Sequence, residues 1–229
     1  MKPPAKHSTI SSIKFTMLVK VCGLRDPGNI RQVSAIQGVD LVGMIFYPHS
    51  PRFVDSQSTA QVVCSLTTVK VAGVFVNEIA EEVANKCEIY HLDYVQLHGS
   101  ETPDYLTSLL NLLPSRVKLI KAFSVKTQED LLSVSDFEGL CSYFLFDTPT
   151  SGYGGSGMSF DWHILQNYCG LTPFFLSGGI GSESLHLLKQ FHHKRWAGID
   201  LNSRFEIAPA QKNIPLLTDF VHQFKNIQT

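Results

Sequence analysis

Cysteine is sparse in this 229-residue chain, and no two cysteines form a Cys-x-x-Cys pair. The five are scattered along the sequence, at Cys22, Cys64, Cys87, Cys141 and Cys169. A disulfide framework needs an even set of cysteines and a structural zinc site needs closely spaced ligands, so the pattern favours neither. Scattered free thiols are typical of the reducing cytosol, and we therefore expect a cytoplasmic protein.

Long apolar runs are also absent. No stretch reaches the roughly 20 apolar residues that a membrane-spanning helix requires. Residues 1–16 carry three lysines and a histidine but no apolar segment of the kind found in a signal peptide. We expect them to form a flexible N-terminal extension, with Met17 as an alternative start, ahead of one catalytic domain over residues 17–229.

An excess of either charge is missing as well. Lys and Arg together number 19, Asp and Glu number 20, and the formal net charge is −1. Nucleic acids and anionic membranes attract a surplus of positive charge, so we expect neither as a partner. A charged fraction of 17% and an apolar fraction of 44% are those of a well-packed globular protein. Any anionic ligand must then be held by a local site.

What the sequence does contain is a series of short apolar runs that alternate with longer amphipathic stretches. Eight runs are predicted as strands, at residues 18–21, 41–46, 69–76, 94–97, 118–122, 143–146, 174–176 and 197–200. Several are apolar throughout, as expected for strands that are covered on both faces of a parallel sheet.

A helix-like stretch follows each predicted strand. Residues 29–37 and 213–224, for example, place apolar side chains on one face at helical spacing. Eight such strand–helix units predict an α/β fold, a single (β/α)8 TIM barrel. A doubly wound sheet is the competing architecture, but it would usually show a G-x-G-x-x-G segment after its first strand, which this sequence lacks.

The first predicted strand ends in a lone thiol, Cys22, just before Gly23. Barrel enzymes build their active sites at the carboxyl ends of their strands, so Cys22 is a candidate catalytic residue. Lys20 lies two residues earlier, on the same face of the strand, where an ammonium group favours the thiolate. The alternative is a small buried apolar side chain, the role that we assign to the other four cysteines.

The sixth predicted strand ends in a carboxylate, Asp147, shortly before a glycine-rich segment at residues 151–157. Asp147 is either an active-site group or a cap for the next turn. Four glycines close together beside a carboxylate suggest close approach of the backbone to a ligand. A thiol, a carboxylate and glycine-rich turns at strand ends predict acid/base chemistry on a phosphorylated substrate.

Two further turns predict where a phosphate group binds. Gly178 and Gly179 follow the seventh predicted strand, and Asn202 and Ser203 follow the eighth. Backbone N–H groups after strands seven and eight, together with a helix N-terminus, form the usual phosphate site of such barrels.

Three other polar side chains are placed at strand ends. Arg52 follows the second predicted strand in a loop stiffened by two prolines, either as a solvated surface residue or as a bidentate carboxylate anchor. Gln96 and His98 alternate onto one face of the fourth strand, where His98 either lines the barrel mouth or is a satisfied structural histidine. No clustered set of His, Asp, Glu or Cys suggests a metal ligand set, so we predict none.

Several sequence motifs are jointly very specific. KVCG, FYPxSPR, QLHG, GYGGxGxxFDW, FFLSGGI and GIDLNSRFE occur in this order between residues 18 and 206. On these motifs the chain resembles the phosphoribosylanthranilate isomerase family of tryptophan biosynthesis. The resemblance implies a (β/α)8 barrel without a cofactor that is an aldose–ketose isomerase. Its reaction is the Amadori rearrangement of N-(5-phosphoribosyl)anthranilate to 1-(2-carboxyphenylamino)-1-deoxyribulose 5-phosphate.

The resemblance also implies roles for individual residues. Cys22 matches the family's general base, Asp147 its general acid, and Arg52 its anchor for the anthranilate carboxylate. The implied phosphate site lies on the backbone around Gly155, Gly178, Gly179, Asn202 and Ser203. Asp200 matches an acidic position at the same mouth, without an assigned step. Arg204 departs from the family, which more often has glycine there, so the resemblance does not define the detailed geometry of the phosphate loop in this chain.

The implied partner is a small phosphosugar–anthranilate substrate, and the protein is expected to be a monomer or a homodimer. Two related barrels stay as alternatives. A histidine-pathway isomerase performs the same rearrangement with two carboxylates, and Cys22 argues against it; a ribulose-phosphate epimerase would need a metal site. A third alternative is a phosphosugar-binding barrel without turnover, which an activity assay distinguishes at once.

Overall fold

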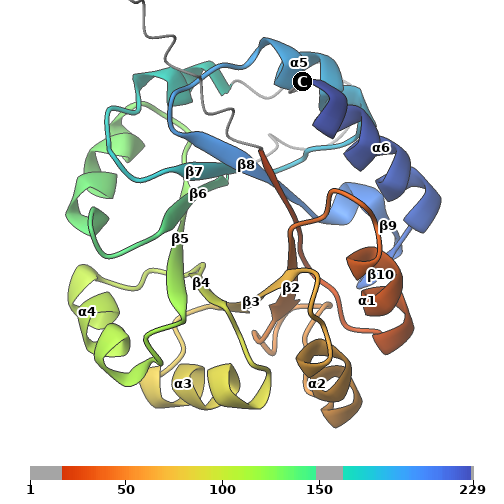
Figure 1. Cartoon of the computed structure of the whole chain (residues 1–229). Helices are drawn as coiled ribbons and strands as arrows, with labels where there is room; N and C mark the ends of the chain where they lie inside the picture. Colours follow the sequence, from red (N-terminus) through yellow and green to blue (C-terminus); the bar gives the residue numbers. More distant parts are fainter. Residues whose placement is uncertain (1–16, 148–161, 228–229) are drawn as a thin grey trace, which may run out of the picture.

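Eight parallel strands close into a barrel in a computed structural model that describes residues 17–147 and 162–227 (Figure 1). The strands are β1 (Leu18–Val21), β2 (Leu41–Ile45), β3 (Lys70–Phe75), β4 (Tyr94–Leu97), β5 (Lys118–Ser124), β6 (Tyr143–Asp147), β7 (Phe174–Ser177) and β8 (Trp196–Leu201). Each strand pairs with its neighbour in sequence, and β1 pairs with β8. The predicted (β/α)8 barrel is confirmed, and an open doubly wound sheet is excluded.

Helices surround the barrel (Figure 1). They are α1 (Pro27–Ser34), α2 (Gln57–Cys64), α3 (Ala80–Ile89), α4 (Pro103–Leu112), α5 (Leu185–Gln190) and α6 (Ile214–Ile227), with the 3₁₀ helices η1 (Glu129–Phe137), η2 (Trp162–Asn167), η3 (Ser182–Ser184) and η4 (Ser203–Phe205). Within the described residues, no helix is both long enough and apolar enough to cross a lipid bilayer.

The connection after β5 differs from an ordinary α-helix. Helix η1 is a 3₁₀ helix of nine residues. Ser133 and Ser135 each donate a side-chain hydrogen bond to the backbone carbonyl three residues earlier, at 3.1 and 3.0 Å. Side-chain bonds of this kind compete with the backbone hydrogen bonds of a regular helix.

A short hairpin between β8 and α6 was not predicted. Strands β9 (Glu206–Ala208) and β10 (Gln211–Lys212) pair in an antiparallel arrangement and pack near α1 and α6 in Figure 1. Its turn contains Ala210 at a φ of 67°, a left-handed conformation that favours glycine. Strands of three and two residues carry no readable periodicity, which is why sequence patterns do not indicate them.

The barrel interior changes from apolar to polar along its axis. Leu41, Ile120, Ala122, Leu145 and Phe175 form a separate buried apolar cluster, the inward-facing set of alternating strand residues. Farther along β1, the inward-facing residue is Lys20, whose register partner on β8 is Asp200. The interior of the barrel therefore contains a packed apolar layer, and its polar groups lie toward the carboxyl ends of the strands.

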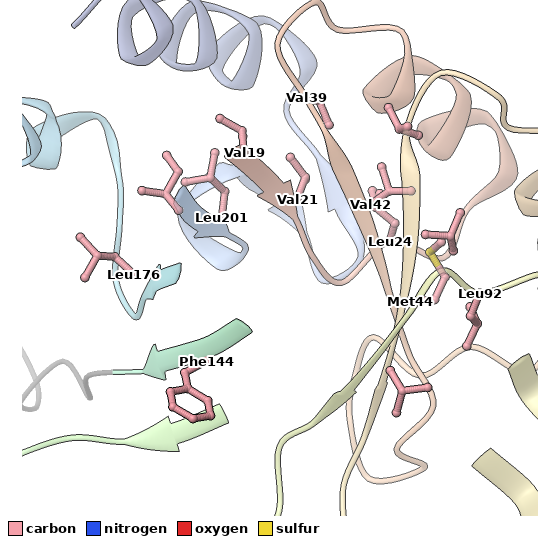
Figure 2. Packing of buried hydrophobic residues seen from close by; sticks show 14 of the residues in the cluster. Val19, Val21, Leu24, Val39, Val42, Met44, Leu92, Phe144, Leu176 and Leu201 are labelled. Carbon is pink, nitrogen blue, oxygen red and sulfur yellow. The ribbon is translucent and has the colours of Figure 1, made fainter. Parts of the chain in front are cut away.

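The main core lies between the strands and the surrounding helices. Figure 2 shows part of it, with Val19 and Val21 on β1, Leu201 on β8, and Phe144 on β6. Phe144 has no exposed surface, and its ring lies 5.2 Å from that of Phe123 in an edge-on arrangement. Burial of both faces of the strands explains their uninterrupted apolar sequences.

Candidate active site

A cavity of about 210 Å³ opens at the carboxyl ends of the strands. Seven of the nine predicted site residues line it: Cys22, Asp147, Gly178, Gly179, Asp200, Asn202 and Ser203. Gly155 and the glycine-rich segment 151–157 lie outside the described residues. Arg52 does not line this cavity, and it is described below. The topology therefore gathers these residues from the ends of four strands, β1, β6, β7 and β8, into one site.

Cys22 lies at the end of β1 with only 3% of its surface exposed. Its backbone N–H donates to the carbonyl of Leu201 at 2.8 Å, which ties it to the end of β8. A Cβ atom at Gly43 would come within 2.9 Å of the Cys22 Sγ, so glycine on β2 leaves space for the sulfur. The thiol is thus held rigidly at the floor of the cavity.

Opposing forces act on the Cys22 thiol. Burial raises the pKa of Cys22 above the usual value, whereas the ammonium groups of Lys20 and Lys212 act to lower it. The expectation that Lys20 favours the thiolate has the right sign, but burial outweighs it. Asp200 adds a further upward contribution to the pKa of Cys22.

Lys20 and Asp200 form a buried ion pair beneath the cavity. The Nζ of Lys20 donates to Oδ1 of Asp200 at 2.9 Å, and the two side chains are 0% and 7% exposed. Burial alone acts to lower the pKa of Lys20, but Asp200 and Cys22 outweigh it and leave that pKa raised. Asp200 therefore balances the charge of Lys20, and this partner explains why an acid is tolerated so deep in the barrel.

Asp147 lies at the end of β6 and faces a histidine. Its Oδ2 is 3.4 Å from Nε2 of His98, and Gln96 Nε2 donates to His98 Nδ1 at 3.1 Å. The His98 ring therefore lies between the Gln96 amide and the Asp147 carboxylate, with one ring nitrogen facing each. Gln96 and His98 both line the cavity, which confirms the prediction that they share one face of β4.

His98 is the partner of Asp147 that sequence reasoning left unassigned. The available signal was its two-residue spacing from Gln96 at the end of β4. Nothing in the sequence indicates that β4 and β6 bring their ends within ion-pair distance. The Oε1 atom of Gln96 is buried and accepts no hydrogen bond from the described residues, which makes it an available acceptor beside the cavity.

The predicted phosphate-site residues form one wall of the cavity. Gly178 and Gly179 have φ angles of 89° and 62° at the end of β7, in the left-handed region that favours glycine. Asn202 and Ser203 reach the same cavity from the end of β8. Arg204, exposed and also at this wall, adds a cation where the family more often has glycine.

Arg52 is neither a solvated surface residue nor free to turn. Its Nε donates to the two carboxylate oxygens of Glu206 at 2.9 and 3.1 Å, and its Nη2 donates at 2.6 Å. The hydrogen bonds with Glu206 raise the pKa of Arg52. A Cβ atom at Gly23 would lie 2.6 Å from the Arg52 Cδ, so the side chain passes directly over the residue after Cys22.

Lys212 and Glu206 are functional candidates that the sequence did not reveal. The Nζ of Lys212 donates to Oε1 of Glu206 and to Oδ1 of Asn202, both at 2.8 Å. Lys212 has 0% of its side chain exposed. Glu206 lies within a recognised motif, but its partner Arg52 is 154 residues away in sequence, and no local pattern indicates the pair.

Metal ligation has no geometric support in the described part of the chain. Within residues 17–147 and 162–227, no three His, Cys, Asp or Glu side chains are grouped to hold a metal ion. We predict that EDTA leaves the activity unchanged; a loss that Zn²⁺ or Mg²⁺ restores would contradict this. The groups of the cavity lining that can move protons are a thiol, two carboxylates and an imidazole.

A barrel whose strand ends carry a thiol, carboxylates and an imidazole beside a cluster of cations is typical of enzymes that transfer protons on an anionic substrate. Residues 19–223 match the family model of N-(5'-phosphoribosyl)anthranilate (PRA) isomerase. The chain belongs to this family.

Individual relatives agree with the assignment. An N-(5'-phosphoribosyl)anthranilate isomerase from Parabacteroides distasonis is 47% identical over 209 residues, covering 90% of this chain and 93% of the relative. The crystal structure of the phosphoribosyl anthranilate isomerase from Thermotoga maritima is 29% identical, with a TM-score of 0.80 and coverage of 92% and 99%.

A second solved structure of such an isomerase contains reduced 1-(o-carboxyphenylamino)-1-deoxyribulose 5-phosphate. It is 27% identical to this chain, with a TM-score of 0.77 and coverage of 92% and 99%. This neighbour supports a small-molecule substrate for the family.

Proposed function

We propose that this barrel performs the reaction of its family with Cys22 as the general base and Asp147 as the general acid. The reaction is the Amadori rearrangement of N-(5-phosphoribosyl)anthranilate to 1-(2-carboxyphenylamino)-1-deoxyribulose 5-phosphate, an aldose–ketose isomerisation in tryptophan biosynthesis. The observation that carries the proposal is that the thiol and the carboxylate line one cavity beside a pair of left-handed glycines.

Ring opening is the first step. Asp147 donates its proton to the ribose ring oxygen, the bond between this oxygen and C1 breaks, and the nitrogen lone pair forms an iminium at C1. His98, 3.4 Å from the carboxylate, orients Asp147 and stabilises the carboxylate that this step produces.

Removal of the C2 proton is the second step. The Cys22 thiolate takes this proton, and the C2–H electrons form a double bond to C1 while the iminium nitrogen becomes neutral. The resulting enolamine gains a proton at C1 and loses one from the 2-hydroxyl group to give the ketone. An acid and a base on different strands, β6 and β1, keep separate protonation states during this sequence.

Binding is assigned to the remaining residues. The phosphate is bound by backbone N–H groups around Gly178, Gly179 and Ser203, with Arg204 as an additional cation. Arg52, oriented by Glu206, binds the anthranilate carboxylate. Gly155 belongs to the phosphate site by resemblance alone, because it lies outside the described residues.

Location and assembly are part of the proposal. A cytoplasmic enzyme is supported by the five free cysteines and by the biosynthetic role of the family. A monomer or a homodimer is supported by a related solved structure of monomers generated from the dimeric Thermotoga maritima enzyme, 26% identical with a TM-score of 0.77. Sedimentation of the purified protein distinguishes the two.

The test is a fluorescence assay that follows loss of phosphoribosylanthranilate, applied to Cys22→Ser. We expect kcat to fall about 10²- to 10⁴-fold, because a hydroxyl group is a far poorer base than a thiolate at neutral pH. Cys64→Ser, a change at an exposed cysteine on α2, is the matched control and should keep full activity. Near-normal turnover by Cys22→Ser would remove the thiol from the mechanism.

A further inference from the structure

Lys212 is a fully buried lysine on a two-residue strand, and its backbone is held from both sides. Its N–H donates to Oδ1 of Asn29 at 2.8 Å, and the Asn29 amide donates back to the Lys212 carbonyl at 3.1 Å. Asn29 lies on α1 and is itself 1% exposed. These two bonds fix where the lysine side chain begins.

The ammonium group of Lys212 has an acceptor for each of its three protons. Besides Oε1 of Glu206 and Oδ1 of Asn202, the Nζ reaches the Asn202 backbone carbonyl at 3.3 Å. A neutral amine would donate only two bonds, so the geometry fits the charged form. Burial is the largest influence and lowers the pKa of Lys212 overall, while Glu206 acts in the opposite direction.

The four residues Arg52, Asn202, Glu206 and Lys212, which we call the Lys212 cluster, carry an unbalanced charge. Arg52 and Lys212 are two cations that share one anion, Glu206. Lys20 is already neutralised by Asp200. One positive charge is therefore left over at this side of the cavity, and burial makes it more effective than it would be in water.

The surplus charge lies beside Cys22. Gly23 follows Cys22, and a Cβ atom there would lie 2.5 Å from the Asn202 Oδ1 and 2.6 Å from the Arg52 Cδ. The charged groups around the thiol come from four elements: Lys20 on β1, Asp200 on β8, Lys212 on β10, and Arg52 in the loop after β2.

We propose that Lys212 is a positioning residue of this active site. Its buried ammonium group fixes Asn202 and the Glu206–Arg52 pair, and it supplies the positive charge that the Cys22 thiolate and the substrate carboxylate need as a counterion. The role in binding rests on the proposed function, whereas the effect on the thiol is a property of the free protein.

The first test measures the rate at which iodoacetamide alkylates Cys22 as a function of pH, by mass spectrometry of the Cys22 peptide. Lys212→Met should move the alkylation midpoint upward by on the order of 1 pH unit. Lys225→Met is the matched control. Lys225 is also a partly buried lysine in an ion pair, with Asp40 at 2.7 Å, but it bonds to Met17 at the opposite end of β1 and should leave the midpoint unchanged.

The second test uses Glu206→Gln, which removes the shared anion and leaves both cations. This variant should lower the alkylation midpoint, whereas Lys212→Met should raise it. If the substitutions only loosened the site, the midpoints of both variants would shift in the same direction. The Glu206→Gln variant also tests the charge assignment of the Lys212 cluster if Lys212→Met does not fold. An unchanged or raised midpoint in Glu206→Gln overturns the proposal, as does an unchanged midpoint in a folded Lys212→Met.

Turnover of the same variants tests the binding role. Lys212→Met and Glu206→Gln should both raise KM for the anthranilate substrate at least tenfold, because each disturbs the orientation of Arg52, while Lys225→Met should not. If Cys22→Ser retained normal turnover, the proposed chemistry would fail, but the alkylation midpoints would still decide the charge assignment. Normal KM values in both variants overturn the positioning role.

Discussion

The Cys22 thiol shows how one residue depends on charges that lie far away in the sequence. Burial disfavours its thiolate, while Lys20 and Lys212 favour it. A neutral thiol is a weak base, so the rate of C2 proton removal should rise with pH as the thiolate forms. Because the pKa of Cys22 is raised overall, this increase is expected on the alkaline side of neutrality.

Asp147→Asn should be at least as damaging as Cys22→Ser. Asparagine keeps the shape and the contact with His98, but it cannot deliver a proton to the ring oxygen, and no later step occurs without ring opening. We expect kcat to fall about 10²- to 10⁴-fold in the fluorescence assay. Retention of wild-type kcat would disprove the acid assignment, and Asp200, the other acid at the mouth, would become the candidate.

The sequence predicted the cavity residues that lie at the ends of recognisable strands. It did not predict those whose role depends on contacts between distant segments. Cys22 and Asp147 each end a readable strand, and parallel topology brings strand ends together, so their meeting was predictable. The ion pair between Arg52 and Glu206 was not predictable, because it joins the loop after β2 to a hairpin whose strands are too short to recognise in the sequence. Lys212 carried no signal at all, since its burial is created by that hairpin.

At the scale of elements, apolar runs were enough to locate all eight strands. The third strand was predicted over residues 69–76 and is Lys70–Phe75, an error of one residue at each end. The type of helix was harder to predict, since the helix-like stretch after β5 is a 3₁₀ helix. Hydrophobic period reports which side is buried, not how tightly a helix winds.

Phe144→Ala tests the core between the strands and the helices. The ring is completely buried and packs edge-on against Phe123, so its removal should leave a cavity and cost about 3–5 kcal/mol of unfolding free energy. Urea denaturation measures this loss. The control is Leu132→Ala on η1, where the side chain is 74% exposed and the expected change is within about 0.5 kcal/mol. Equal effects would show that Phe144 is not a core contact.

At the scale of the whole molecule, we predict that residues 1–16 are dispensable. A chain starting at Met17 keeps the first barrel contacts, since Met17 is 6% exposed and its carbonyl accepts a hydrogen bond from Lys225 at 2.7 Å. Its melting temperature and kcat should match those of the full chain. A large drop in melting temperature would show that the segment packs against the barrel.

The closure of β1 against β8 also has a consequence for synthesis. The partners that complete the site are separated by nearly the whole chain: Lys20 and Asp200 by 180 residues, and Asn29 and Lys212 by 183. Synthesis on the ribosome makes Cys22 and Lys20 early, whereas Asp200 and Lys212 are made much later. The barrel therefore cannot close around Cys22, and the thiol cannot acquire its full set of charged neighbours, until the ribosome has passed residue 212.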